Sequence, residues 1–112
     1  MQIRILALLA ASAVISCAPL ALAADNAEPT IVIKDHKFSP AEVHVPAGKR
    51  ITLTVDNQDT TPEEFESKPL RLEKVIPGGG KGVVRFGPLA KGTYSFYGEF
   101  HEDTAQGKVI AE

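Results

Sequence analysis

The sequence predicts an all-β protein, a Greek-key β-sandwich or barrel of about seven strands. Apolar and polar residues alternate over short runs, as Ile51, Leu53 and Val55 do between polar neighbours, and this alternation is typical of a strand with one face on a core. The 9 glycines and 8 prolines stand between these runs as turn residues. No stretch has helical periodicity. Two antiparallel sheets that bury their apolar faces against each other fit this pattern.

Residues 1–23 are predicted to be a secretory signal peptide. A short basic start precedes an apolar run at residues 5–15, and a small-residue site follows at residues 21–23. The run is too short to span a membrane as a helix. Val-Ile-Ser before Cys17 resembles a lipobox, so lipidation of Cys17 is the alternative, but the apolar stretch continues to the better site after residue 23. Either way we expect a periplasmic protein whose mature domain does not insert into the membrane.

The rest of the chain is expected to hold one small domain. Residues 24–29 are predicted to be a disordered lead and residues 30–112 a single folded domain. The domain has no cysteine, so sheet packing or a bound ion must stabilise it without disulfides. The formal net charge of −2 argues against a nucleic-acid partner. No serine has an identifiable His and acid partner, and so small a domain offers no large cleft, which favours a binding protein over an enzyme.

The first half of the domain contains three expected strands. They cover residues 30–34, 42–45 and 50–57. Val43 and Val45 are expected to face the core, so His44 between them should be exposed. His36 lies in the first turn, residues 35–40, and the sequence does not fix its position relative to the rest of the fold.

The second half of the domain contains the remaining expected strands. They begin near Glu63, continue through the alternating Leu70, Leu72 and Val75, and then cover residues 83–86, 93–100 and 107–110. In the strand from Thr93, one face is expected to pack on the core and consists of Tyr94, Phe96, Gly98 and Phe100. The glycine-rich segment at residues 77–82 lacks the Gly-Lys-Ser/Thr signature of a phosphate cradle, so it is interpreted as a turn.

The loop between the last two strands gathers potential metal ligands. Four such side chains lie within five positions: Glu99, His101, Glu102 and Asp103. The loop lies at one rim of the expected sheet, where binding residues tend to be placed. An acidic loop is also typical of a solvated surface, and this alternative stays open for Glu102 and Asp103.

Two segments resemble a known family. Tyr94-Ser95-Phe96-Tyr97-Gly98, then His101, then Gly-Lys-Val at residues 107–109, is similar to the last hairpin of the small cupredoxins, the plastocyanin-like blue-copper proteins. Residues 31–57 resemble their opening half, down to the Val-Pro-Ala-Gly turn. Blue-copper sites use Cys, two His and a weak axial Met. Gly98 stands where the Cys would be, and no Met lies between His101 and residue 107, so the blue-copper centre is expected to be absent.

Two motifs together give a closer resemblance. Pro-Glu-Glu-Phe-Glu-Ser at residues 62–67 and Gly-Glu-Phe-His-Glu-Asp-Thr-Ala at residues 98–105 are similar to the periplasmic partners of bacterial high-affinity iron permeases. This resemblance implies that the protein handles iron or copper beside an inner-membrane iron permease and other periplasmic iron-uptake proteins. Whether the ion is only carried or also oxidised stays open. The alternatives are a metal-free β-sandwich interaction module and a copper-handling or electron-transfer protein.

The resemblance also suggests where the ligands lie. It puts Glu63 at the position of the first His ligand, just before the core residue Phe65, with Glu64 and Glu66 on the opposite face as an outer acidic patch. A one-residue slip of register would turn Glu63 to solvent. The predicted metal ligands are His101, Glu63, Glu99, Glu64, Glu66 and Asp103. Carboxylates around one imidazole make a mostly oxygen site that suits iron or manganese and also accepts Cu(II) or Zn(II).

Overall fold

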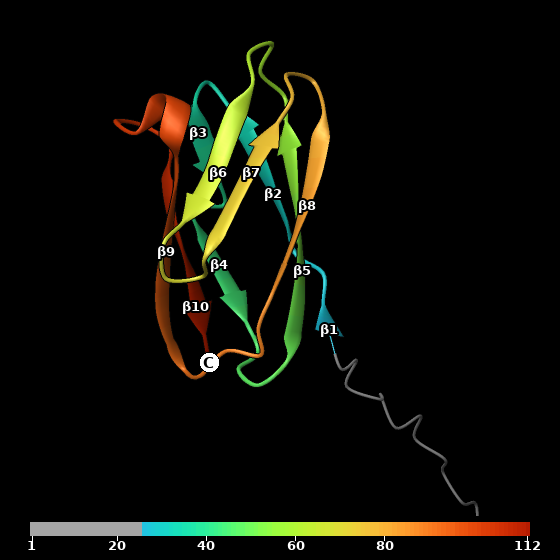
Figure 1. The fold of residues 1–112 in the computed structure, drawn as a ribbon, viewed down its shortest axis with the longest axis vertical. Coiled ribbons are helices and arrows are strands. Elements are labelled where there is room, and N and C mark those ends of the chain that lie inside the picture. Colours follow the sequence, from blue (N-terminus) through green and yellow to red (C-terminus); the bar gives the residue numbers. More distant parts are fainter. Residues whose placement is uncertain (1–25) are drawn as a thin grey trace, which may run out of the picture.

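The computed structural model describes residues 26–112, so the predicted signal peptide and Cys17 lie outside the described residues. These residues form two five-stranded sheets packed as a sandwich, with one short 3-10 helix (Figure 1). The strands are β1 (Asn26–Ala27), β2 (Thr30–Lys34), β3 (Lys37–Ser39), β4 (Glu42–Val45), β5 (Arg50–Asn57), β6 (Glu63–Ser67), β7 (Leu72–Ile76), β8 (Lys81–Phe86), β9 (Gly92–Gly98) and β10 (Gln106–Ala111), and η1 is Glu99–His101. The predicted all-β sandwich is therefore confirmed.

Strand pairing explains why the structure has more strands than expected. Both β1 and β2 pair in parallel with β5, while β8 pairs antiparallel with the other edge of the same strand. The lead predicted to be disordered, residues 24–29, thus contains the two-residue strand β1. The chain from β3 to β4 changes sheets, since β3 pairs with β2 in one sheet and β4 with β10 in the other. The segment at residues 35–40, which was expected to be a turn, therefore contains strand β3, and β1 and β3 are the strands that the sequence pattern did not predict.

The second sheet carries the functional end of the molecule. Its order is β4-β10-β9-β6-β7, with β9 at the centre between β10 and β6. Phe65 of β6 lies opposite Gly98 of β9. This register places the start of β6 beside the end of β9, where η1 begins. Figure 1 shows η1 at the same end of the sandwich as the turn between β2 and β3.

Three aromatic rings fill the core beneath that end. The ring centroid of Phe96 lies 5.0 Å from that of Phe65 and 5.1 Å from that of Phe38. All three side chains are buried, and the Phe38 ring meets the other two nearly edge-on. Such aromatic pairs stabilise a core beyond the area they bury. The cluster therefore supports the start of β6 and η1 from the core side.

Two apolar residues lie on the surface against expectation. The strand predicted to run to Phe100 ends at Gly98, and Phe100 is 49% exposed in η1. The chain turns there because the His101 carbonyl accepts hydrogen bonds from the N–H groups of Thr104 and Ala105. Val75 is 54% exposed because it lies three residues after Leu72, an odd step that puts it on the opposite face of β7. Within residues 26–112, no helix is long and apolar enough to cross a membrane.

Candidate metal centre

Glu63 is a carboxylate buried at the end of the core. Strand β6 alternates strictly, with Glu63, Phe65 and Ser67 facing inward, and Glu63 is only 1% exposed. Its Oε1 accepts hydrogen bonds from the N–H groups of Phe100 (2.9 Å) and Glu64 (3.1 Å). Its Oε2 makes a short contact with Nδ1 of His101. The buried charge is therefore fully engaged, as burial of a carboxylate requires.

Gly98 leaves the space that the Glu63 carboxylate occupies. A Cβ at position 98 would lie 2.6 Å from Cδ of Glu63 and 2.7 Å from Cβ of Ala105. Atoms cannot approach this closely without displacement. The residue that stands at the expected Cys position is thus a glycine for a steric reason: the acidic side chain from β6 takes the volume that a thiol would fill.

His36 is presented by a tight hairpin turn. Lys34 pairs with Lys37 across β2 and β3, and the two residues between them have positive φ angles, 53° at Asp35 and 58° at His36. A two-residue hairpin loop with both residues in this region is a type I′ turn, which suits the right-handed twist of the strands. The turn projects the His36 side chain toward η1.

The imidazole rings of His36 and His101 stack. Their centroids lie 3.6 Å apart with an angle of 13° between the planes. The Thr104 hydroxyl donates a hydrogen bond of 2.7 Å to the His36 carbonyl, which joins the two loops. Two histidines separated by 65 positions in the chain (101 − 36) are thereby held in contact.

Asp59 holds the turn between β2 and β3 through hydrogen bonds to its backbone. Its carboxylate accepts hydrogen bonds from the N–H groups of Asp35 (2.8 Å) and His36 (3.0 Å), and Oδ2 lies 3.4 Å from Nδ1 of His36. The His36 N–H hydrogen bond is the main reason that the pKa of Asp59 is lowered below its usual value. Asp59 therefore stays ionised and holds His36 in place.

His36, Glu63 and His101, which we call the inner group, can converge on one ion. Each offers one ligating atom, and these atoms lie within 4.8 Å of one another. Metal–nitrogen distances of about 2.0–2.1 Å put two nitrogens on a tetrahedral ion roughly 3.3 Å apart, so the spacing is close to what an ion needs. The in-plane lone pairs of two stacked rings point in parallel directions and not toward a common point. One ring must therefore rotate before both histidines can bind the same ion. His36, 42% exposed against 27% for His101, has more room to do so.

The residues present do not fit a blue-copper ion but do fit a nitrogen and oxygen site. Residues 26–112 contain neither cysteine nor methionine, so no thiolate or thioether can come from this part of the chain. Imidazole suits Zn, Cu, Fe and Ni, and carboxylate suits harder ions. A site of two imidazoles and one carboxylate therefore matches a divalent transition metal.

A second cluster, the outer group, lies on the opposite face of β6. It consists of Glu64, Glu66, Glu73 and Glu99, whose carboxylate oxygens lie within 4.8 Å of one another. One buried oxygen, Oε2 of Glu66, has no hydrogen-bond partner among the described residues. Hydrogen bonding to the Glu66 and Glu64 carboxylates, and their negative charge, raise the pKa of Glu99 to about 7. Glu99 is therefore partly protonated at neutral pH, and a cation can replace this proton.

The structure separates the six predicted ligands into two groups. Glu63 and His101 belong to the inner group, whereas Glu64, Glu66 and Glu99 belong to the outer group. The alternation of β6 and the helical turn of η1 cause this division, since both elements send side chains to both groups. Asp103 is exposed and belongs to neither. Glu102 is exposed as well, and its carbonyl accepts a hydrogen bond from Nε2 of Gln106.

Sequence reasoning missed two members of these groups. The sequence pattern does not place His36 in the site, although an Asp-His pair between two alternating runs is compatible with a type I′ turn, which would put His36 at a hairpin tip. Glu73 was missed because its place in the outer group depends on the register of the β6–β7 hairpin, which puts it opposite Glu66. Recognition of the turn between these strands would have found that cross-strand pair.

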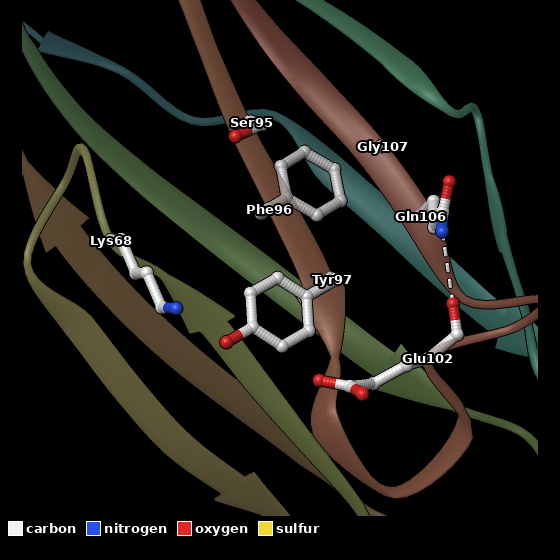
Figure 2. A pocket seen from close by; sticks show the side chains of 7 residues that line it. All are labelled: Lys68, Ser95, Phe96, Tyr97, Glu102, Gln106 and Gly107. Atoms are coloured by element: carbon white, nitrogen blue, oxygen red, sulfur yellow. Dashed lines mark hydrogen bonds between the residues drawn. The ribbon is translucent and has the colours of Figure 1, made fainter.

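A surface pocket of about 370 Å³ lies beside the outer group. Its lining residues are Lys68, Ser95, Phe96, Tyr97, Glu102, Gln106 and Gly107. Figure 2 shows the ring of Tyr97 between the side chains of Lys68 and Glu102. Burial first, then hydrogen bonding to Glu66, raise the pKa of Tyr97 above its usual value. The Tyr97 phenol therefore stays neutral, and its hydrogen bond to Glu66 connects the pocket to the acidic cluster.

Comparison with curated proteins finds a relative that shares nearly half of the aligned residues. A curated relative, an uncharacterized protein of Rickettsia prowazekii (strain Madrid E), is 46% identical over 83 residues, which are 74% of this chain and 66% of that protein. The alignment thus spans just under two thirds of the relative's length.

Solved structures agree in fold at low sequence identity. Auracyanin A, a "blue" copper protein from Chloroflexus aurantiacus, superposes with a TM-score of 0.67 at 16% identity, covering 78% of this chain and 99% of that one. A purple cupredoxin from Nitrosopumilus maritimus gives 0.59 at 21% identity, covering 75% and 99%. The metal-binding domain of the Cu(I)-exporting P-type ATPase of Streptococcus pneumoniae D39 gives 0.68 at 16%, covering 82% and 91%. These likenesses concern the fold alone.

A family profile supplies the assignment. The profile of the cupredoxin-like domain matches residues 4–111 of the 112 residues of the chain. The sandwich, the position of the histidine loop after β9 and the structural neighbours agree with that match. The chain belongs to the family of cupredoxin-like domains.

Proposed function

We propose that this protein binds a divalent transition-metal ion through the inner group and acts in the periplasm as an accessory to iron uptake. The observation that carries the metal-binding proposal is the convergence of His36, Glu63 and His101, three ligating side chains from three different segments, with their ligating atoms within 4.8 Å. Nothing about packing alone requires two histidines to meet over a buried carboxylate.

The three side chains have different tasks in the proposal. Glu63 supplies negative charge at the buried end and, through its contact with Nδ1, orients the His101 ring. His36 closes the site from the solvent side, where it is half-exposed. When bound, the ion supplies redox or Lewis-acid chemistry that these side chains lack. Copper and iron both suit imidazole and carboxylate ligands, so the donor set supports either metal.

The outer group favours iron within the same proposal. Its four carboxylates offer only oxygen, the ligand type of hard ions such as Mn(II) or Fe(III). One buried oxygen without a hydrogen-bond partner adds a specific reason to expect a cation there.

The partner proposal rests on the resemblance of residues 62–67 and 98–105 to proteins that work beside iron permeases. Oxygen and imidazole ligands near the surface suit delivery to an inner-membrane permease better than storage, because His36 is half-exposed. The competing candidates are copper handling, which the fold's copper-binding relatives favour, and a metal-free interaction module. Oxidation of ferrous ion at the site is compatible with the first proposal.

Titration calorimetry tests metal binding. The purified protein is titrated with Fe(II), Mn(II), Cu(II) and Zn(II), and the same titrations are made on His101→Ala and on the control His44→Ala. His44 is exposed and belongs to neither group, so its substitution should leave binding unchanged. We expect saturable binding that His101→Ala weakens at least tenfold. Binding that is absent, or that depends on His44 and not on His101, contradicts the proposal.

A deletion strain tests the iron role separately. We expect slow growth under iron limitation, restored by the wild-type gene and by His44→Ala but not by His101→Ala or Glu63→Ala. If the deletion strain takes up iron normally and instead loses copper tolerance, the copper-handling alternative replaces the iron role while the metal site stands.

A further inference from the structure

The outer surface of β5 and β8 carries a second pocket, far from both carboxylate groups. It has a volume of about 470 Å³ and is lined by Arg50, Ile51, Thr52, Arg85, Phe86 and Gly87. Arg50 opens β5, whereas Asp59 follows the other end of that strand. Residues 53–57 of β5, at about 3.3 Å each, therefore lie between this pocket and the end of the strand that leads to Asp59. Figure 1 shows the start of β5, beside β1, at the end of the sandwich opposite η1.

Strand register brings the two arginines to one face. Thr52 pairs with Arg85 and Ile51 pairs with Phe86. Ile51 and Phe86 point into the core, so their neighbours Arg50, Thr52 and Arg85 point outward. Arg50 is thus the diagonal neighbour of Arg85, at a separation of about 7–8 Å between strand positions. Both guanidinium groups border the same hollow.

Glycine keeps the hollow open between them. Gly87 has a φ of 90°, and a Cβ there would lie 2.8 Å from the carbonyl oxygen of Lys49 and 3.8 Å from Cα of Arg50. Gly87 therefore packs directly against the backbone at the start of β5 and adds no side chain to the pocket that it lines.

Neither arginine has an acidic partner among residues 26–112. None of the ion pairs found in that part of the chain reaches Arg50 or Arg85. Two like charges side by side repel each other unless an anion lies between them. The chain has more acidic than basic residues, 14 against 12, yet no carboxylate of residues 26–112 pairs with either arginine.

We propose that Arg50, Thr52 and Arg85 form a binding site for a phosphate group, either a free phosphate or the headgroup of a phospholipid. Guanidinium binds phosphate oxygens through two parallel N–H donors, so two arginines can hold a tetrahedral anion from two sides. Thr52 lies opposite Arg85 in the register and lines the same pocket, so its hydroxyl is a further donor. One arginine satisfies a planar carboxylate, whereas the paired arrangement provides donors for three or more oxygens. This site is independent of the metal centre, so failure of metal binding leaves it untouched.

Titration of the ¹⁵N-labelled protein with inorganic phosphate tests the site. We expect saturable amide shifts confined to residues 50–52 and 85–87. The double variant Arg50→Ala, Arg85→Ala should abolish these shifts. Arg85→Lys keeps the positive charge but loses the two parallel N–H donors of the guanidinium, so it should weaken binding about tenfold. The control is Lys74→Ala with Lys81→Ala, which removes the same charge from other exposed positions of the same molecule. Shifts that are uniform and linear, or equal in the arginine and lysine variants, overturn the proposal.

Vesicles identify the source of the phosphate. Cosedimentation with phosphatidylglycerol vesicles that is lost in the double arginine variant and kept in the double lysine variant assigns the site to a lipid headgroup. Binding of inorganic phosphate without cosedimentation assigns it to a soluble phosphate. No arginine-dependent binding of either probe overturns the site. Both arginines are exposed, so the double variant should unfold at the wild-type temperature, which a thermal scan checks.

Discussion

The imidazole ring of His36 lies flat against that of His101, 3.6 Å from centroid to centroid, and each ring has its own carboxylate. Asp59 pairs with His36, and Glu63 pairs with His101. The turn between β2 and β3, the segment after β5, strand β6 and η1 thus meet at one point. Four segments that are distant in sequence are held together there by polar contacts above an aromatic core. Any change in this arrangement should appear both in stability and in metal binding.

Substitution of Gly98 by Ala should destabilise the fold and displace Glu63. The added Cβ would meet the Glu63 carboxylate and the Ala105 methyl group at under 3.0 Å. Overpacking of this kind costs about 1–3 kcal/mol. Urea unfolding measures the loss, with Ser95→Ala, an exposed position of the same strand, as the control. Equal stability of Gly98→Ala and the wild type would show that the volume beside Glu63 is not filled as described.

Removal of the Glu63 carboxylate should have the largest effect on stability. Glu63→Ala leaves a cavity, leaves the Phe100 and Glu64 N–H groups without their acceptor and removes the partner of His101. We expect a loss of about 2–5 kcal/mol in the free energy of unfolding. Glu63→Gln, which keeps the shape and one acceptor oxygen, should lose clearly less. Similar losses for both variants in urea unfolding would mean that the hydrogen bonds of Glu63 contribute little.

The sequence predicts the strands well because buried and exposed side chains alternate along them in the structure as apolar and polar residues alternate in the sequence. Val43 and Val45 are inward and His44 is exposed, as expected, and Glu63 and Phe65 share the buried face of β6. The sequence could not supply the contact of His36 with His101, because it depends on how a hairpin from one sheet lies over a loop from the other. The sequence also did not predict that β9 ends at Gly98, because Phe100 continues the apolar alternation of the strand. In the structure, hydrogen bonds to the His101 carbonyl turn the chain there. Local patterns fix which face a side chain takes but not which distant segment it meets.

Glu99 should make stability depend on pH near neutrality. Hydrogen bonding to Glu66 and Glu64 raises the pKa of Glu99 to about 7 from an ordinary value of 4.5. A carboxyl group whose pKa is raised in the folded state stabilises that state below the unfolded pKa, and this contribution is lost as the pH rises through the folded pKa. The melting temperature should therefore fall between about pH 5 and pH 8. Glu99→Gln, which stays neutral, should reduce that fall, whereas the control Asp103→Asn should not. An equal fall of the melting temperature in the wild type, Glu99→Gln and Asp103→Asn would contradict a raised pKa of Glu99.

Asp59 should make stability depend on pH in the opposite sense and in a lower range. The pKa of Asp59 is lowered from 3.8, chiefly by the hydrogen bond from the His36 N–H. The ionised group therefore stabilises the fold above the unfolded pKa, and the contribution is lost as the pH falls through the folded pKa. Asp59→Asn should lose about 1 kcal/mol at pH 7 and less at about pH 3, below the ordinary pKa of 3.8. Urea unfolding at the two pH values measures this, and a loss that is the same at both would contradict it.

The most direct test of the metal centre follows the histidine side chains during a Zn(II) titration. Long-range ¹H–¹⁵N spectra resolve the ring nitrogens of His36, His44 and His101, and Zn(II) is diamagnetic. Convergence of the inner group on one ion predicts that the ring signals of His36 and His101 shift together and saturate at one equivalent, while those of His44 do not move. Saturation at one equivalent with His101 shifting and His36 unchanged, or with His44 shifting alone, would contradict a site built from the stacked pair.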